Sequence, residues 1–203
     1  PYSRSITVVA MVDLVLIRAG QSEYENQGRI QGTLDVPLST SGCDQVEEAA
    51  EQLRAAPFEL AALYAGPCHG VQQTAATLGK LLGLKPKTLE LLKNIDLGLW
   101  QGMLVDDVKQ KQPKVFKKWR GAPDSVCPPQ GETLQRVRER LKKAVAKIEK
   151  KHKSGVVGIV MPGPLVHVMR SELCEQPVAD LWKFQGSEAP LWELIETSAR
   201  RDG

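Results

Sequence analysis

The feature that most constrains the fold is an alternation of short, apolar, β-rich runs with longer helical stretches along the 203 residues. Residues 12–17 form an apolar run interrupted only by Asp13, as expected of a strand buried on both faces. Further strands are expected at residues 60–65, 88–92, 156–161 and 191–197, and helices at 45–53, 72–82, 132–151 and 165–173. The alternation predicts an α/β fold, a three-layer sandwich with a mostly parallel central sheet flanked by helices.

The clearest single element is the helix expected over residues 132–151. Its apolar residues recur every three or four positions and form one stripe, made of Leu134, Val137, Leu141, Val145 and Ile148. The β-branched run 156–161 reads as a central strand. In parallel sheets of this kind, ligands bind at the carboxyl ends of the strands. Residues that directly follow the expected strands are therefore the first candidates for a functional site.

Residues 103–130 break the alternation, with short Lys-rich helices followed by several prolines. We expect a single domain over 1–203 with a basic, lid-like insertion at about 103–130. Residues 103–153 carry 15 Lys and Arg against 6 Asp and Glu, although the whole chain has a net charge of only +3. The basic side chains that open this segment are Lys109, Lys111, Lys114, Lys117, Lys118 and Arg120. They form either a solvated helical face or a surface for an anionic partner. The four tryptophans are expected to be packing residues; Trp119, among these lysines, is the first candidate for an exposed one.

Composition and cysteine spacing exclude several classes of protein. The 42% hydrophobic and 25% charged residues are typical of a globular chain, not of a disordered or collagen-like one. No apolar run approaches the roughly 18 residues of a membrane span, and no strong nucleic-acid signal is present. The four cysteines form no CxxC or Cys/His ligand pattern. We expect a cytoplasmic protein with reduced thiols and with neither a metal ion nor a cofactor.

Short motifs in a fixed order point to one family. The first expected strand leads into RAGQSEY at 18–24 and GRIQG at 28–32; QTA at 73–75, GLWQG at 98–102 and GET at 131–133 follow. Taken together, they resemble the histidine phosphatase superfamily, the group that contains the phosphoglycerate mutases. The resemblance covers residues 12–197, nearly the whole chain, and implies a phosphoglycerate mutase-like fold.

In that family, a histidine after the first strand attacks phosphorus and an acidic residue protonates the leaving oxygen. Two arginines, a second histidine and an asparagine hold the phosphate oxygens, because charge spreads over these oxygens during transfer. Carried over residue by residue, the nucleophile falls on Ala19, the proton donor on Asn94 and the second histidine on Pro162. The first arginine is retained as Arg18, and the second falls on Gly70.

The family's phosphate-binding asparagine falls on Glu25, and Asn26 is one position too late. A carboxylate at position 25 places a negative charge where the family has a neutral amide. We expect Arg18 and Glu25 to form an ion pair, and the degenerate pocket, with Gly70, to bind phosphate weakly.

These losses predict a pseudo-phosphatase, which is no enzyme and is retained for binding or regulation. An alternative stays open: a phosphatase or phosphoglycerate mutase-like enzyme with residual or altered activity on small phosphate esters. It would use polar groups such as Arg18, Glu25, Asn94 and His69, with one of them poised as a base. A third possibility is a binder of an anionic partner through the basic insertion.

Overall fold

The computed structural model describes residues 11–178, 181 and 190–196 of the chain. Their core is a five-stranded sheet in the order β3-β2-β4-β1-β5. The strands are β1 (Met11–Arg18), β2 (Leu60–Ala65), β3 (Lys87–Thr88), β4 (Ser154–Met161) and β5 (Trp192–Ile195). All neighbours are parallel except β5, which runs antiparallel to β1. The predicted central position of β4 is confirmed; residue 197, the expected end of the last strand, lies outside the described residues.

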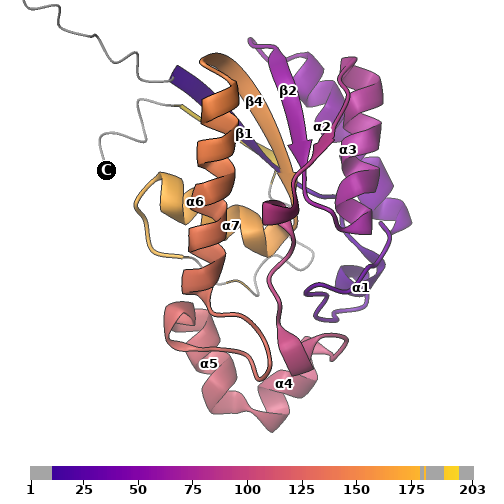
Figure 1. Cartoon of the computed structure of the whole chain (residues 1–203). Helices are drawn as coiled ribbons and strands as arrows, with labels where there is room; N and C mark the ends of the chain where they lie inside the picture. The colour runs from indigo at the N-terminus through magenta and orange to yellow at the C-terminus, as the bar shows by residue number, and fades with distance from the viewer. Residues whose placement is uncertain (1–10, 179–180, 182–189, 197–203) are drawn as a thin grey trace, which may run out of the picture.

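Helices cover both faces of the sheet (Figure 1). The helices α2 (Thr40–Arg54) and α3 (His69–Leu82) lie on one side, and α6 (Leu134–Lys151) and α7 (Gly163–Leu173) lie on the other. Side chains of β1 alternate between the two layers, because successive residues of a strand point to opposite faces. Leu14 and Leu16 pack in the cluster that contains α6 and α7, whereas Val15 and Ile17 pack in the cluster with α2 and α3. The predicted three-layer α/β architecture is confirmed.

Local signals account for most element boundaries. Ser39 caps α2 by accepting a hydrogen bond from the backbone N of Gly42 at 3.1 Å. The helix α3 ends at Gly83, whose φ of 69° lies in the left-handed region that favours glycine. The strand expected at 88–92 is shorter than predicted: β3 stops at Thr88 and a 3₁₀ turn, Glu90–Leu92, follows. That turn directs the chain toward the carboxyl end of the sheet.

The segment expected as a lid-like insertion folds into short helices beyond the carboxyl ends of the strands (Figure 1). They are α4 (Val105–Lys111), α5 (Pro113–Gly121) and the 3₁₀ turn Pro123–Ser125. The expected packing role is confirmed for Trp119, although it stands among lysines. Its side chain is 1% exposed and packs edge-on against Trp100, with ring centroids 5.7 Å apart. The apolar contact outweighs the polar neighbourhood, because α5 turns its lysines outward and its aromatic residues toward the core.

No helix among the described residues is long and apolar enough to cross a membrane.

Candidate active site

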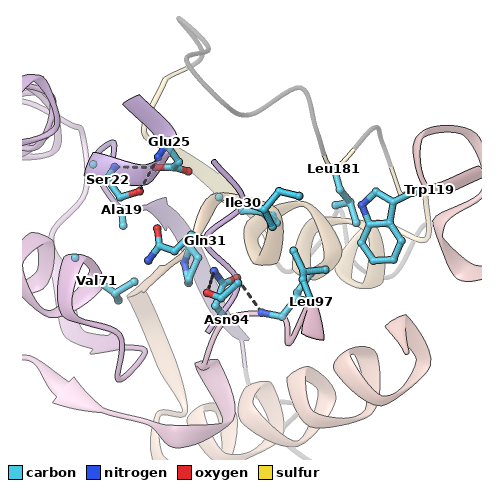
Figure 2. A pocket seen from close by; sticks show the side chains of 17 residues that line it. Ala19, Ser22, Glu25, Ile30, Gln31, Val71, Asn94, Leu97, Trp119 and Leu181 are labelled. Atoms are coloured by element: carbon cyan, nitrogen blue, oxygen red, sulfur yellow. Dashed lines mark hydrogen bonds between the residues drawn. The ribbon is translucent and has the colours of Figure 1, made fainter. Parts of the chain in front are cut away.

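A pocket opens at the carboxyl ends of β1 and β4, where the family resemblance places the reaction. It contains about 770 Å³ of empty space, part of which is open to solvent. Its walls come from the loop after β1, the first turn of α3, residues 94–97 and the first turn of α7, with Trp119 and Leu181 at one end (Figure 2).

Positions far apart in the sequence converge on this pocket. Of the six positions onto which family catalytic or phosphate-binding residues were carried, Arg18 is not among the residues that line the pocket, whereas Ala19, Gly70, Asn94 and Pro162 line it. Glu25 lines it too, from the short helix α1 (Glu23–Asn26). Nucleophile and proton-donor positions are therefore adjacent in space, but they carry a methyl group and a carboxamide.

Close backbone packing explains why the motif glycines around the first loop remain. A Cβ on Gly20 would lie 2.3 Å from the carbonyl oxygen of Gly42, so the loop after β1 meets the start of α2 with no room for a side chain. The backbone N of Gly20 also donates to Oγ1 of Thr74 at 3.2 Å. The RAG and QTA motifs thus hold the loop against α3, and this role does not depend on a catalytic histidine.

The side chain of Arg18, the last residue of β1, is 7% exposed. Its Nε has no hydrogen-bond partner, and burial lowers the pKa of the guanidinium. The negative charge of Glu25 acts in the opposite direction and raises the pKa of Arg18, so the two groups interact electrostatically. The expected ion pair is nevertheless absent from the described structure, and Arg18 forms no salt bridge with any other residue that the structure describes.

A local capping box explains why Glu25 does not reach Arg18. Oε2 of Glu25 accepts a hydrogen bond from the backbone N of Ser22 at 2.8 Å, and Oγ of Ser22 accepts one from the backbone N of Glu25 at 3.2 Å. Burial raises the pKa of the Glu25 carboxyl, while Ser22 and the charge of Arg18 lower it. Asn26, the neighbour one position along, is exposed and does not line the pocket. The Ser-x-x-Glu spacing is a sequence signal that could have predicted this geometry.

Asn94 serves as an anchor between two loops. It is 4% exposed; its Nδ2 donates to the carbonyl of Gly32 at 2.6 Å, and its Oδ1 accepts from the backbone N of Ile95 at 2.8 Å. Arg140 holds the same segment from behind, with Nη2 3.2 Å from the carbonyl of Asn94 and 2.8 Å from Glu132. The Asn94 side chain is thus occupied by protein contacts.

None of the three histidines lines the pocket within the described chain. His69 is exposed, and its backbone N donates to Asp35 at 2.7 Å. His152 lies at the opposite end of the sheet, 3.0 Å from the hydroxyl of Tyr64. His167 lies half-buried on α7, where burial, followed by the charges of Arg170 and Arg18, lowers its pKa to about 4. Its ring is therefore neutral at pH 7.

No sequence pattern predicted the apolar wall at the other end of the pocket. Ile30, Leu97, Trp119 and Leu181 line it, opposite Ala19, Ser22 and Glu25 (Figure 2). Ile30 belongs to the GRIQG motif, but nothing in its spacing distinguishes a pocket residue from a core residue.

The described residues contain no group of three or more His, Cys, Asp or Glu side chains placed to hold a metal ion.

Comparison with known proteins agrees with this geometry. The model of the histidine phosphatase superfamily (branch 1) matches residues 14–201, and the chain belongs to that family. Phosphoserine phosphatase 1 of Hydrogenobacter thermophilus is 30% identical over 192 residues, which cover 95% of this chain and 90% of the relative. A mycobacterial glucosyl-3-phosphoglycerate phosphatase, solved in complex with VO₃, is 27% identical with a TM-score of 0.79, over 91% of this chain and 90% of that one.

These relatives correct the expectation that the chain is not an enzyme. Both are named as phosphatases, which points to an enzyme, so the interpretation as an inactive pseudo-phosphatase is wrong. That interpretation followed from substituted family positions alone. It did not foresee that the pocket stays open and keeps a carboxyl group, that of Glu25.

Proposed function

We propose that this chain is a phosphatase of small phosphate monoesters, working with groups other than the histidines of its family. The observation that carries the proposal is Arg18, a buried guanidinium at the carboxyl end of β1 whose Nε has no hydrogen-bond partner among the described residues. A buried charge without a counter-ion is costly, and a nearby anion relieves that cost. Arg18 is not among the residues that line the pocket, so a phosphate group held beside its neighbour Ala19 would interact with the guanidinium through its field.

Glu25 is the group that handles protons in this proposal. A water molecule attacks phosphorus in line, a bond forms between its oxygen and phosphorus, and the bond from phosphorus to the ester oxygen breaks. The Glu25 carboxylate takes the water's proton, and solvent entering the open pocket protonates the departing ester oxygen on the far side of phosphorus. Burial raises the pKa of the Glu25 carboxyl, which makes its carboxylate a stronger base than an exposed one. No phosphohistidine forms at position 19, because a methyl group cannot attack phosphorus.

The relatives support the substrate class. Phosphoserine and glucosyl-3-phosphoglycerate, the compounds in the names of the two relatives above, are both small phosphate monoesters.

The test measures release of inorganic phosphate from p-nitrophenyl phosphate, phosphoserine and 3-phosphoglycerate by the purified chain. We expect turnover that is lost in Arg18→Met and kept in Arg54→Met, a control at an exposed arginine of α2. Turnover in ¹⁸O-labelled water should place the label in the released phosphate, with no acid-stable or acid-labile phosphoenzyme. Absence of turnover, together with absence of phosphate binding by calorimetry, would overturn the proposal.

A further inference from the structure

The pocket has two chemically different ends, and the second end has no part in the proposed phosphate chemistry. Ser22 and Glu25 lie at the end next to Ala19, whereas Leu97, Trp119 and Leu181 lie at the other (Figure 2). Gln31 and Asn94 lie between them. A phosphate ester bound at the Ala19 end must extend its alcohol portion along this second end.

The apolar end is rigid. Trp119 is 1% exposed and is fixed edge-on against Trp100 at an interplanar angle of 88°. Ile30 is fixed by its backbone, whose N donates to the carbonyl of Met103 at 2.9 Å. Leu97 begins the turn before the 3₁₀ helix Gly98–Trp100, and the backbone N of Trp100 donates back to its carbonyl at 3.1 Å. A preformed apolar wall of this kind favours an apolar ligand at little cost in ordering.

Charges around the pocket exclude a polar alcohol portion. Glu25 is the only ionisable side chain among the described residues that line the pocket, and it is acidic. The carboxylate of an amino-acid or glycerate ester would lie in a half-apolar pocket with no lining cation to pair with it. The side-chain amides in the middle of the pocket each already use an N–H group within the protein. Nε2 of Gln31 donates to the carbonyl of Leu34 at 3.2 Å, and Nδ2 of Asn94 donates to the carbonyl of Gly32.

Resting on the proposed function, we infer that the substrate is a phosphate monoester of an apolar alcohol or phenol. Its ring or chain packs on Leu97 and Trp119, while its phosphate lies beside Ala19. This chemistry differs from that of the compounds in the relatives' names, which carry carboxylates or sugar hydroxyls. The substrate preference follows from the wall opposite the phosphate end, where this chain presents apolar side chains.

The first experiment compares kcat/KM for 1-naphthyl phosphate with that for phosphoserine. We expect a preference of at least about tenfold for the aryl ester, the size of effect that one well-formed apolar contact gives. Leu97→Ala should reduce that preference several-fold, and Leu97→Met, which keeps apolar volume, should preserve it. Leu99→Ala is the matched control, because Leu99 belongs to the same short helix but is 58% exposed and does not line the pocket.

The second experiment measures binding without turnover, through quenching of tryptophan fluorescence by phenylphosphonate and by phosphoserine. Tighter binding of phenylphosphonate supports the inference even if no ester is hydrolysed, in which case the proposed function alone fails. A preference for phosphoserine in either experiment overturns the inference and leaves the proposed function standing. Equal preference in the wild type and in Leu97→Ala also overturns it.

Discussion

At the scale of single residues, the pocket is governed by two charges that do not neutralise each other. Arg18 is buried and pairs with no carboxylate within the described part of the chain, and Glu25 is held by the backbone of Ser22. The Glu25 carboxylate accepts a hydrogen bond from Ser22, which lies only three residues earlier and caps the first turn of α1. This local hydrogen bond determines where the carboxylate lies. A phosphate group in the pocket therefore meets one attractive and one repulsive charge.

Replacing Glu25 by glutamine separates binding from proton transfer. The amide oxygen can still accept the hydrogen bond from Ser22, but the negative charge is gone. We expect phosphate to bind up to about tenfold more tightly, since one repulsion near the surface is worth about 1 kcal/mol. Turnover should fall by about 10²-fold or more, the usual contribution of a general acid–base group. Calorimetry with phosphate and initial-rate kinetics measure the two effects, and unchanged turnover would remove Glu25 from the mechanism.

Restoring the family nucleophile alone should not restore the family mechanism. Ala19→His places an imidazole on the pocket wall, but positions 70, 94 and 162 still carry Gly, Asn and Pro. Catalytic groups that act as a unit are strongly non-additive. We expect the rate to stay within about tenfold of the parent and no phosphohistidine to accumulate after alkaline quenching of a reaction with a good phosphodonor. A stable phosphohistidine would show that the remaining pocket already supports transfer to position 19.

At the scale of secondary structure, periodicity predicted the elements well and their lengths less well. The unbroken apolar run before Arg18 and the stripe on α6 were sufficient to place a buried strand and a packed helix. The short length of β3 was not predictable, because Leu89–Leu92 is apolar enough to continue the strand. The chain instead leaves the sheet in a 3₁₀ turn, where Arg140 donates a hydrogen bond to the carbonyl of Leu91.

The candidate site was predictable in position but not in chemistry. The aligned motifs identified Ala19 and Pro162, and the parallel sheet places both at the same end of β1 and β4. The missing ion pair was not predicted, because it depends on which of two contacts Glu25 forms in three dimensions, and a capping hydrogen bond holds Glu25. The packing of Trp119 was expected from its residue type, but its partner Trp100 was not.

The helix α7 should make the fold sensitive to mild acid. Its His167 has a pKa of about 4 in the folded chain, against an ordinary value of 6.5, chiefly because of burial. The unfolded chain therefore binds a proton on this side chain at a higher pH than the folded chain does. This contribution to stability is complete above pH 6.5 and is lost as the pH falls toward 4, by about 2 kcal/mol after allowance for partial exposure.

Urea unfolding of the wild type and of His167→Gln, measured between pH 4 and pH 7.5, tests this expectation. The wild type should lose stability over that range and the variant should lose less, because glutamine takes up no proton. His69→Gln is the control, since His69 is exposed. Parallel curves for wild type and His167→Gln would mean that other groups cause the acid sensitivity.

At the scale of the whole molecule, charge is distributed unevenly around the pocket. The six basic side chains expected to be exposed, Lys109, Lys111, Lys114, Lys117, Lys118 and Arg120, are all exposed on α4 and α5. The helix α5 also carries Trp119, which lines the pocket, so part of the basic surface lies on the same helix as a wall of the site that we propose to bind dianions. A positive surface next to a pocket raises the local concentration of anions, and salt weakens the effect.

We therefore expect kcat/KM for a phosphate ester to fall about tenfold between 10 mM and 200 mM salt, because charges separated by more than about 8 Å are largely screened at the higher value. The kcat value should change little, since bound substrate no longer depends on long-range attraction. The triple variant Lys114→Gln, Lys117→Gln, Lys118→Gln should flatten this salt dependence. The control triple, Lys147→Gln, Lys150→Gln, Lys151→Gln, removes the same charge from α6, near the far end of the sheet, and should leave the dependence intact. Equal flattening by both triples would mean that only net charge matters. A polyanion that inhibits the wild type but not the α5 triple would instead identify this surface as a docking site for an anionic partner.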